Sequence, residues 1–321
     1  MRSNLKIVFL DTATTTGEDL SLDSLKNYGT FIHYERTAPD EIIERAKDAD
    51  ILIVNKVVID KKVIDACPHL RYILVSATGY NNVNIDYARQ VEIPVSNVKG
   101  YSTEGVVQHV FSLILKGLNQ VDYYNQEVKE NRWNSSEDFC FYDHSIRELN
   151  GKTLGIYGLG TIGSRVVQVG QAFGMNAIAY HPDPNSLIHP VAQLVDQDEL
   201  LSRSDILSLH APLNEASRHF INADSLKKMK RGSILINTAR GGVVDENALA
   251  NSLKENHLSF AGIDTLPEEP PTKGSPLIGL ENCFVTPHIA WATYDSRQRL
   301  ISRLEENIKA FFAGKINNQV N

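Results

Sequence analysis

The chain has 321 residues, which at roughly 150 residues per domain predicts two domains. Its 42% hydrophobic and 22% charged residues are typical of a folded globular protein and exclude wholesale disorder. With 32 Lys and Arg against 39 Asp and Glu, the formal net charge of −7 argues against a general nucleic-acid-binding protein, which needs a basic face. A single arginine could still hold a small anionic substrate.

Cysteine usage and hydropathy indicate the compartment. Cys67, Cys140 and Cys283 lie far apart without a CxxC pair, which favours a reducing compartment and excludes a disulfide framework or a cysteine zinc site. The histidines show no HxxxH spacing, so we expect no metal site. No stretch approaches the roughly 20 apolar residues of a membrane span, and the N-terminus lacks the apolar core of a signal peptide. We therefore expect a soluble, cytoplasmic protein with no membrane or nucleic-acid partner.

Short apolar runs alternate with longer amphipathic ones in the first third of the chain. Strands are predicted at 6–11, 50–55 and 70–76, and a helix at 20–28. Runs that are apolar throughout fit buried parallel strands, and their alternation with helices predicts an α/β sheet. The segment 96–100 interrupts the pattern. A long helix over about 103–130 follows, with Ser102 or Thr103 as its N-cap.

A second α/β series begins near residue 151. Further strands are predicted at 176–180, 206–210, 233–237, 260–264 and 283–286. A final helix is predicted at 295–313, with these apolar residues on one face: Leu300, Leu304, Ile308, Phe311 and Phe312. We therefore expect two Rossmann-like domains, each a doubly wound parallel sheet, with a cleft between them and a flavodoxin-like arrangement in the first. The first domain is placed at residues 1–98, completed by 291–321, and the second at 99–290.

The segment Gly158–Gly163 (GLGTIG) matches the GxGxxG pattern. Alone this is a weak signal, but here an apolar strand precedes it and a helix follows. In that context the glycines permit a tight turn and close approach to a pyrophosphate, and the helix N-terminus offers it unpaired N–H groups. The segment therefore predicts a dinucleotide cofactor at Gly158, Gly160 and Gly163.

The residue that bonds the adenosine ribose in this fold is usually acidic and lies about 20 residues further on. Here His181 follows the second strand, and Asp183 comes two positions later. His181 could accept a bond from a ribose hydroxyl, contact a 2′-phosphate when protonated, or be an ordinary loop histidine. Because no Arg or Lys occurs between His181 and Ser202, NAD is favoured over NADP.

Three polar residues follow predicted strands of the second series, where ligands bind in open α/β sheets. The guanidinium of Arg240 matches a carboxylate in two-point geometry. The imidazole of His288 can give a proton to a carbonyl oxygen or take it back. A carboxylate at Glu269 beside His288 would favour the protonated imidazole. Each residue alone is compatible with a structural or solvated role, and only the combination favours a site.

These residues resemble the D-isomer-specific 2-hydroxyacid dehydrogenase family, and the resemblance covers nearly the whole chain. The segments that carry it are TGYNNVNID (78–86), IPVSNV (93–98), GLGTIG, INTARGGVVDE (236–246), DTLPEEPP (264–271) and TPHIA (286–290). Three stretches, 101–111, 138–143 and 286–293, are most similar to the glycerate dehydrogenase, or hydroxypyruvate reductase, branch.

The resemblance implies a catalytic set of Arg240, Glu269 and His288. It also implies a substrate-binding first domain, where the backbone N–H groups of Thr78 and Gly79 bind the substrate carboxylate together with Arg240 and His288. The second domain would bind NAD, with further contacts at these positions: Thr161, Ile162, Ala211, Thr238, Ala239, Arg240, Asp264 and His288. Many members carry Asp where this chain has His181.

The implied activity is NAD(H)-dependent reduction of a small 2-keto acid by hydride transfer, with His288 as general acid/base. Hydroxypyruvate, giving D-glycerate, is the first choice, and glyoxylate, giving glycolate, is the next. Another 2-hydroxyacid specificity, of the D-lactate or phosphoglycerate type, fits the same residues. A dinucleotide-sensing protein similar to the transcriptional corepressors with this fold is the alternative class. Those proteins usually carry flexible extensions, whereas this chain begins at a predicted strand and ends at a predicted helix.

Aromatic residues are concentrated between positions 123 and 142. This segment holds six of them, against 8% in the whole chain: Tyr123, Tyr124, Trp133, Phe139, Phe141 and Tyr142. Protein interfaces favour aromatic residues, although packing within the monomer is an alternative. Members of the resembled family dimerise through this region, so we expect a homodimer.

Overall fold

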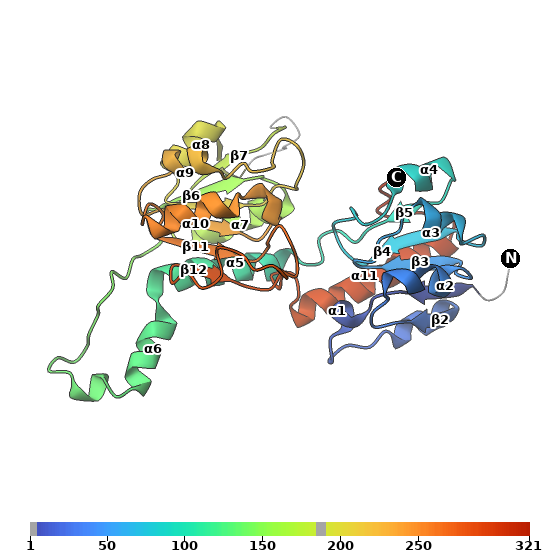
Figure 1. Ribbon diagram of the computed structural model, residues 1–321, viewed down its shortest axis with the longest axis horizontal. Helices are drawn as coiled ribbons and strands as arrows, with labels where there is room; N and C mark the ends of the chain where they lie inside the picture. The colour runs from blue at the N-terminus through green and yellow to red at the C-terminus, as the bar shows by residue number, and fades with distance from the viewer. Residues whose placement is uncertain (1–4, 184–190) are drawn as a thin grey trace. The chain divides into compact units, whose positions relative to one another are not determined.

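The computed structural model describes residues 5–183 and 191–321, which form two compact α/β units (Figure 1). The first unit contains Met1–Ser102 and Trp291–Asn321, and the second contains Thr103–Ala290. The chain therefore leaves the first unit once and returns to it, so that the C-terminal helix belongs to the first unit.

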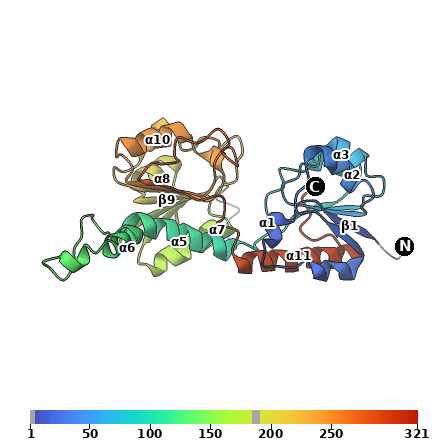
Figure 2. The ribbon, with the colours of Figure 1, turned by 60° about the horizontal axis from the view of Figure 1, so that its bottom comes forward.

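The first unit is built on a five-stranded parallel sheet in the order β2-β1-β3-β4-β5. Its strands are β1 (Lys6–Phe9), β2 (Thr30–His33), β3 (Ile51–Val54), β4 (Tyr72–Val75) and β5 (Val95–Ser96). Its α-helices are α1 (Ala13–Thr16), α2 (Ile42–Ala46), α3 (Lys61–Asp65), α4 (Ile85–Gln90) and α11 (Tyr294–Phe312). The order is the flavodoxin-like one, as predicted. Strands β3 and β4 are buried at every residue because α11 covers one face and α2, α3 and α4 cover the other (Figure 2).

The second unit is built on a seven-stranded sheet in the order β12-β11-β10-β9-β6-β7-β8, and every pair is parallel. Its strands are β6 (Thr153–Tyr157), β7 (Asn176–Tyr180), β8 (Gln193–Leu194), β9 (Ile206–Leu209), β10 (Ile234–Asn237), β11 (Phe260–Ile263) and β12 (Cys283–Val285). The direction of the strand order reverses between β6 and β9. In doubly wound folds the ligand binds at this switch point, outside the carboxyl ends of the strands.

Helices cover both faces of this sheet (Figure 2). The helices of the second unit are α5 (Thr103–Asn119), α6 (Val121–Lys129), α7 (Thr161–Ala172), α8 (Gln197–Arg203), α9 (Ala223–Lys228) and α10 (Glu246–Lys254), of which α6 has no buried residue and covers neither face. Helices α5 and α7 pack together on one face, and α8, α9 and α10 pack on the other. The two predicted α/β series therefore each form one doubly wound sheet.

Two of the predicted helices differ from the structure. The single helix predicted over 103–130 is wrong, because Gln120 adopts a left-handed φ of +50° and separates α5 from α6. Helix α6 has no buried residue, so no packing holds it in line with α5. The helix predicted at 20–28 is a 3-10 helix, η1 (Asp23–Tyr28), in which only Leu25 is buried.

The C-terminal helix is amphipathic, as predicted, but its apolar face ends earlier. Leu300, Leu304 and Ile308 are fully buried, whereas Phe312 is 47% exposed and contacts the ring of Tyr28. Within the described residues, no helix is both long enough and apolar enough to cross a membrane.

Candidate active site

The glycine-rich loop connects β6 to α7 and packs against the loop after β9. Gly158 has a φ of +100°, and a Cβ there would lie 2.8 Å from the backbone nitrogen of Ala211. A Cβ on Gly163 would lie 2.3 Å from the carbonyl oxygen of Gly158. Because side chains at these glycines would collide with backbone atoms, the sequence is restricted to glycine there. The structure thus brings Ala211 against the glycine loop.

The N-terminus of α7 offers unpaired N–H groups. Its N-cap, Gly160, makes no side-chain capping bond, and a Cβ there would meet nothing within 4 Å. The first-turn N–H groups of Thr161 and Ile162 therefore face open space and can bind a phosphate. Thr238 lies with Ala239 between β10 and Arg240, and its Oγ1 is buried without a hydrogen-bond partner in the described residues. A bound dinucleotide would satisfy both kinds of group, so the residues present fit such a cofactor.

His181 lies at the end of β7, and its Nδ1 accepts a hydrogen bond from the backbone N–H of Asp183 at 3.2 Å. This contact needs Nδ1 without a proton, so the neutral ring carries its hydrogen on Nε2. The imidazole can therefore donate from Nε2 to a ribose hydroxyl.

Glu269 and His288 form a close pair. Oε2 of Glu269 lies 2.7 Å from Nδ1 of His288, and both side chains are partly exposed. Because an ionised carboxylate only accepts hydrogen bonds, Nδ1 carries the hydrogen and Nε2 is left to exchange a proton with a ligand. Oε1 of Glu269 accepts the backbone N–H of Leu266 at 2.9 Å, so both carboxylate oxygens are fixed.

Arg240 follows β10 and is positioned by its neighbours. The Asn237 side chain, which is fully buried, donates to the carbonyl of Arg240 at 3.0 Å. A Cβ on Gly241 would lie 2.0 Å from the carbonyl carbon of Leu266, so only glycine lets this loop pack against the one that holds Glu269. The structure therefore brings these two loops together. Sequence analysis missed Asn237, although an amide ending an apolar strand was a usable signal.

Asp264 follows β11, and its carboxylate is fully buried. Its Oδ1 accepts from the Thr286 hydroxyl at 2.6 Å and the Ile289 N–H at 2.9 Å, and its Oδ2 accepts from the Ala290 N–H at 2.9 Å. These bonds hold the loop on both sides of His288, whose φ of +54° is unusual for a residue with a side chain. The contact of Asp264 with a cofactor stays a prediction, whereas its hydrogen bonds to the loop that carries His288 are seen in the structure.

Thr78 and Gly79 belong to the first unit and lie in the loop after β4. The Thr78 hydroxyl donates to the carbonyl of Val98 at 3.0 Å, and the Asn97 amide donates to the carbonyl of Thr78 at 2.6 Å. Within the described part of the chain, the backbone N–H groups of Thr78 and Gly79 have no acceptor. They can therefore bind an anionic group.

His210 follows β9, immediately before Ala211, and its Nε2 lies 2.8 Å from the Ser208 hydroxyl. Burial disfavours the charged imidazole and lowers the pKa of His210 to about 4. The side chain is thus neutral at physiological pH, and it links the loop after β9 to the core of the sheet.

The chain is similar to known proteins over nearly its whole length. Residues 111–290 match the family model described as D-isomer specific 2-hydroxyacid dehydrogenase, NAD binding domain. A hydroxypyruvate reductase of Blautia hydrogenotrophica is 38% identical, over 99% of this chain and 100% of that protein. A glycerate dehydrogenase of Methylorubrum extorquens is also 38% identical, over 98% of each chain. The structure of an acyclic imino acid reductase with NADPH and D-arginine matches with a TM-score of 0.88 at 30% identity, over 99% of this chain and 100% of that one.

The lowered pKa of His210 predicts a stability change in acid. Between pH 6.5, the ordinary value, and about 4, the unfolded chain binds a proton that the folded chain does not. The free energy of unfolding should therefore fall by about 3 kcal/mol as the pH drops through this range. Urea unfolding at both ends of the range should show a smaller drop in His210→Gln than in the wild type. The exposed control His69→Gln should keep the full drop, and an unchanged drop in His210→Gln would contradict the assignment.

Proposed function

The chain belongs to the family of D-isomer-specific 2-hydroxyacid dehydrogenases, and we propose that it reduces hydroxypyruvate to D-glycerate, and glyoxylate to glycolate, with NADH as cofactor. The observation that carries the proposal is the 2.7 Å contact of Glu269 with His288 at the carboxyl edge of the second sheet. The choice of substrate is supported by relatives named hydroxypyruvate reductase and glycerate dehydrogenase. In this proposal the first unit binds substrate and the second binds NAD.

In the proposed reaction, different residues of this chain bind the substrate, donate the proton and orient the proton donor. Arg240 and the N–H groups of Thr78 and Gly79 bind the substrate carboxylate, and Arg240 also polarises the keto oxygen. A nicotinamide dinucleotide held by the glycine loop of the second unit would supply the hydride for the carbonyl carbon. His288, protonated, donates the Nε2 hydrogen to the oxygen as the C=O bond becomes CH–OH. Glu269 stabilises the imidazolium and fixes the ring through Nδ1.

Removal of the imidazole should abolish most of the activity. We expect His288→Ala to lower kcat with hydroxypyruvate by about 10²- to 10⁴-fold, because the general acid is lost. Glu269→Gln should also lower kcat, because a neutral amide no longer stabilises the charged ring. The decrease in NADH absorbance measures both, and Glu268→Gln, which alters the adjacent carboxylate, is the matched control and should keep wild-type kcat.

A dinucleotide-sensing protein, the alternative to an enzyme, should bind the cofactor without reducing a 2-keto acid. A wild-type protein that binds NADH but reduces none of hydroxypyruvate, glyoxylate and pyruvate, with NADH or with NADPH, would contradict the proposed function. It would favour a dinucleotide sensor.

The preference for NADH rests on His181. A 2′-phosphate is normally held by a cation, and no Arg or Lys occurs between His181 and Ser202. The Nδ1 atom of His181 already accepts the Asp183 N–H, so only Nε2 is left to contact a ligand. The ring is instead suited to donate to a ribose hydroxyl.

We therefore expect kcat/KM for NADH to exceed that for NADPH by about 10-fold or more. A tenfold preference needs a difference of only about 1.4 kcal/mol in binding free energy between the two cofactors. His181→Arg should shift the ratio toward NADPH by adding a cation at the ribose, and His181→Gln, without charge, should not. Parallel initial-rate measurements with both cofactors check this. A wild-type preference for NADPH, the cofactor in the similar imino acid reductase, would overturn it.

We also propose a homodimer formed through the arm, defined as residues 121–149. The arm extends from the rest of the second unit (Figure 1), and no residue of α6 is buried. Three of its six aromatic residues are exposed: Trp133 at 51%, Phe139 at 90% and Tyr142 at 75%. Exposed apolar residues gathered on one segment mark a surface that a partner covers.

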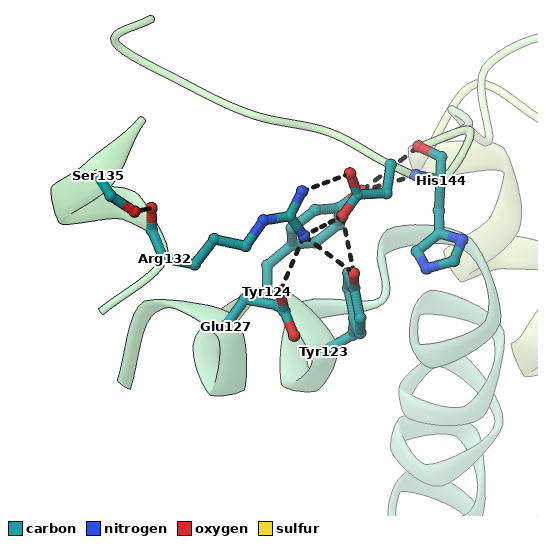
Figure 3. A network of polar contacts seen from close by, with 7 residues as sticks. Tyr123, Tyr124, Glu127, Arg132, Ser135 and His144 are labelled. Atoms are coloured by element: carbon teal, nitrogen blue, oxygen red, sulfur yellow. Dashed lines mark hydrogen bonds and ion pairs between the residues drawn. The ribbon is translucent and has the colours of Figure 1, made fainter. Parts of the chain in front are cut away.

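The arm is held in shape by its own polar network (Figure 3). Arg132 donates to Glu127 at 2.8 Å and to Asp143 at 2.7 Å, and the Tyr123 hydroxyl donates to Asp143 at 2.7 Å. These donors lower the pKa of Asp143 to about 2. The network joins helix α6 to the returning segment of the arm near Asp143, so that the aromatic residues are presented by an ordered segment.

Replacing the exposed aromatic residues should dissociate the dimer. We expect the Phe139→Ser/Tyr142→Ser double variant to be a monomer at micromolar concentration, because the apolar area that drives association is lost. Size-exclusion chromatography with light scattering measures this, and Ser135→Ala in the same arm should leave a dimer. A monomeric wild type at the same concentration would contradict the proposal.

A further inference from the structure

A chain of hydrogen bonds runs from helix α5 to the loop that carries His288. Nε2 of His109 lies 3.0 Å from the hydroxyl oxygen of Thr286. That hydroxyl lies 2.6 Å from Oδ1 of Asp264. The same carboxylate accepts the backbone N–H groups of the two residues that follow His288, each at 2.9 Å. His109 is thus connected to the catalytic loop although it is 177 residues from Thr286 in the sequence.

The direction of these bonds fixes the hydrogen on His109. The ionised Asp264 carboxylate only accepts, so the single hydroxyl hydrogen of Thr286 is donated to it. The Thr286 oxygen can then only accept from His109, and Nε2 of His109 must carry a hydrogen. Nε2 also lies 3.5 Å from Oδ1 of Asp264, and His109 is the only basic side chain within 4 Å of this carboxylate in the described residues.

The catalytic loop needs such support. The backbone of His288 is left-handed, a conformation that costs free energy for a residue with a Cβ and persists only where surrounding contacts impose it. The contacts that impose it here converge on Asp264, whose charge is fully buried and therefore depends on its donors. A weakened donor set would let the loop relax and would displace the imidazole from Glu269.

We propose that His109 is a positioning residue for the reaction: through Thr286 and Asp264 it holds the loop that presents His288 to the substrate. This role rests on the proposed function, because it concerns the same imidazole. His109 acts through the two intervening residues and exchanges no proton with substrate.

Two replacements separate the hydrogen bond from packing. His109→Gln keeps an N–H donor at similar reach, whereas His109→Leu keeps apolar volume and removes the donor. We expect His109→Leu to lower kcat with hydroxypyruvate by about 10-fold or more, because small displacements of a catalytic group are costly. KM should change by less than about 3-fold, and His109→Gln should restore kcat to within about 3-fold of the wild type.

His257→Leu is the matched control in the same unit. It removes another partly buried imidazole, whose Nε2 lies 3.0 Å from the carbonyl of Met229. His257 and Met229 precede strands β11 and β10, so they lie at the edge of the sheet opposite to the one where Arg240 and Glu269 follow these strands. It should lower the melting temperature and leave kcat unchanged. An unchanged kcat in His109→Leu, or an equal loss in His109→Gln, would overturn the positioning role.

A readout without catalysis separates this inference from the proposed function. NMR of the protein with isotope-labelled histidine reports which ring nitrogen carries hydrogen, and the His109 signals are those missing from His109→Gln. We expect hydrogen on Nε2, and a ring protonated on Nδ1 alone would overturn the hydrogen-bond chain. The wild-type protein could instead show hydrogen on Nε2 and yet reduce no 2-keto acid. In that case the hydrogen-bond chain would stand, but the proposed function would fail, and the positioning role would be overturned with it.

Discussion

The buried carboxylate of Asp264 is the interaction on which the catalytic loop depends. Water does not reach this charge, so protein donors must satisfy it, and two of them are backbone N–H groups directly after His288. The loop cannot swing away without leaving the carboxylate unpaired. The need of the buried Asp264 charge for donors therefore fixes the position of the His288 imidazole. Glu269, held at both oxygens, then fixes the rotation of that imidazole.

Close backbone packing supplies the second constraint. The loops that carry Arg240, Glu269 and His288 follow β10, β11 and β12, which are neighbours in the sheet, so topology already places them along one edge. Contact between the first two loops requires more, because any Cβ at Gly241 would overlap the backbone of Leu266. The same device recurs where Gly158 meets Ala211. In both places glycine loses conformational entropy on folding, but it lets two backbone segments come closer than any residue with a Cβ would allow.

The sequence predicts the architecture well where one physical signal dominates. Uniformly apolar runs identify the buried parallel strands, and residues that follow those runs identify the edge where Arg240, Glu269 and His288 gather. Prediction fails where the outcome depends on tertiary contacts. The break at Gln120 reflects the absence of a surface for α6 to pack on, and the amphipathic pattern does not contain that fact. The short strand β8 and the half-exposed strand β2 carry too little apolar character to be recognised. Asn237 and His109 act through bonds to distant backbone or side chains, which local patterns do not encode.

The structure also separates the chemistry of the reaction from the choice of substrate. The Glu269–His288 pair, which we propose as the acid/base pair, and the glycine loop both belong to the second unit. In the first unit, the N–H groups of Thr78 and Gly79, which have no acceptor among the described residues, are the groups that we propose to bind the carboxylate that all these acids share. Discrimination among the acids must then come from side chains that surround the variable end of the substrate. In our proposal, substitutions there change specificity while the buried Asp264 and the loop it holds stay intact.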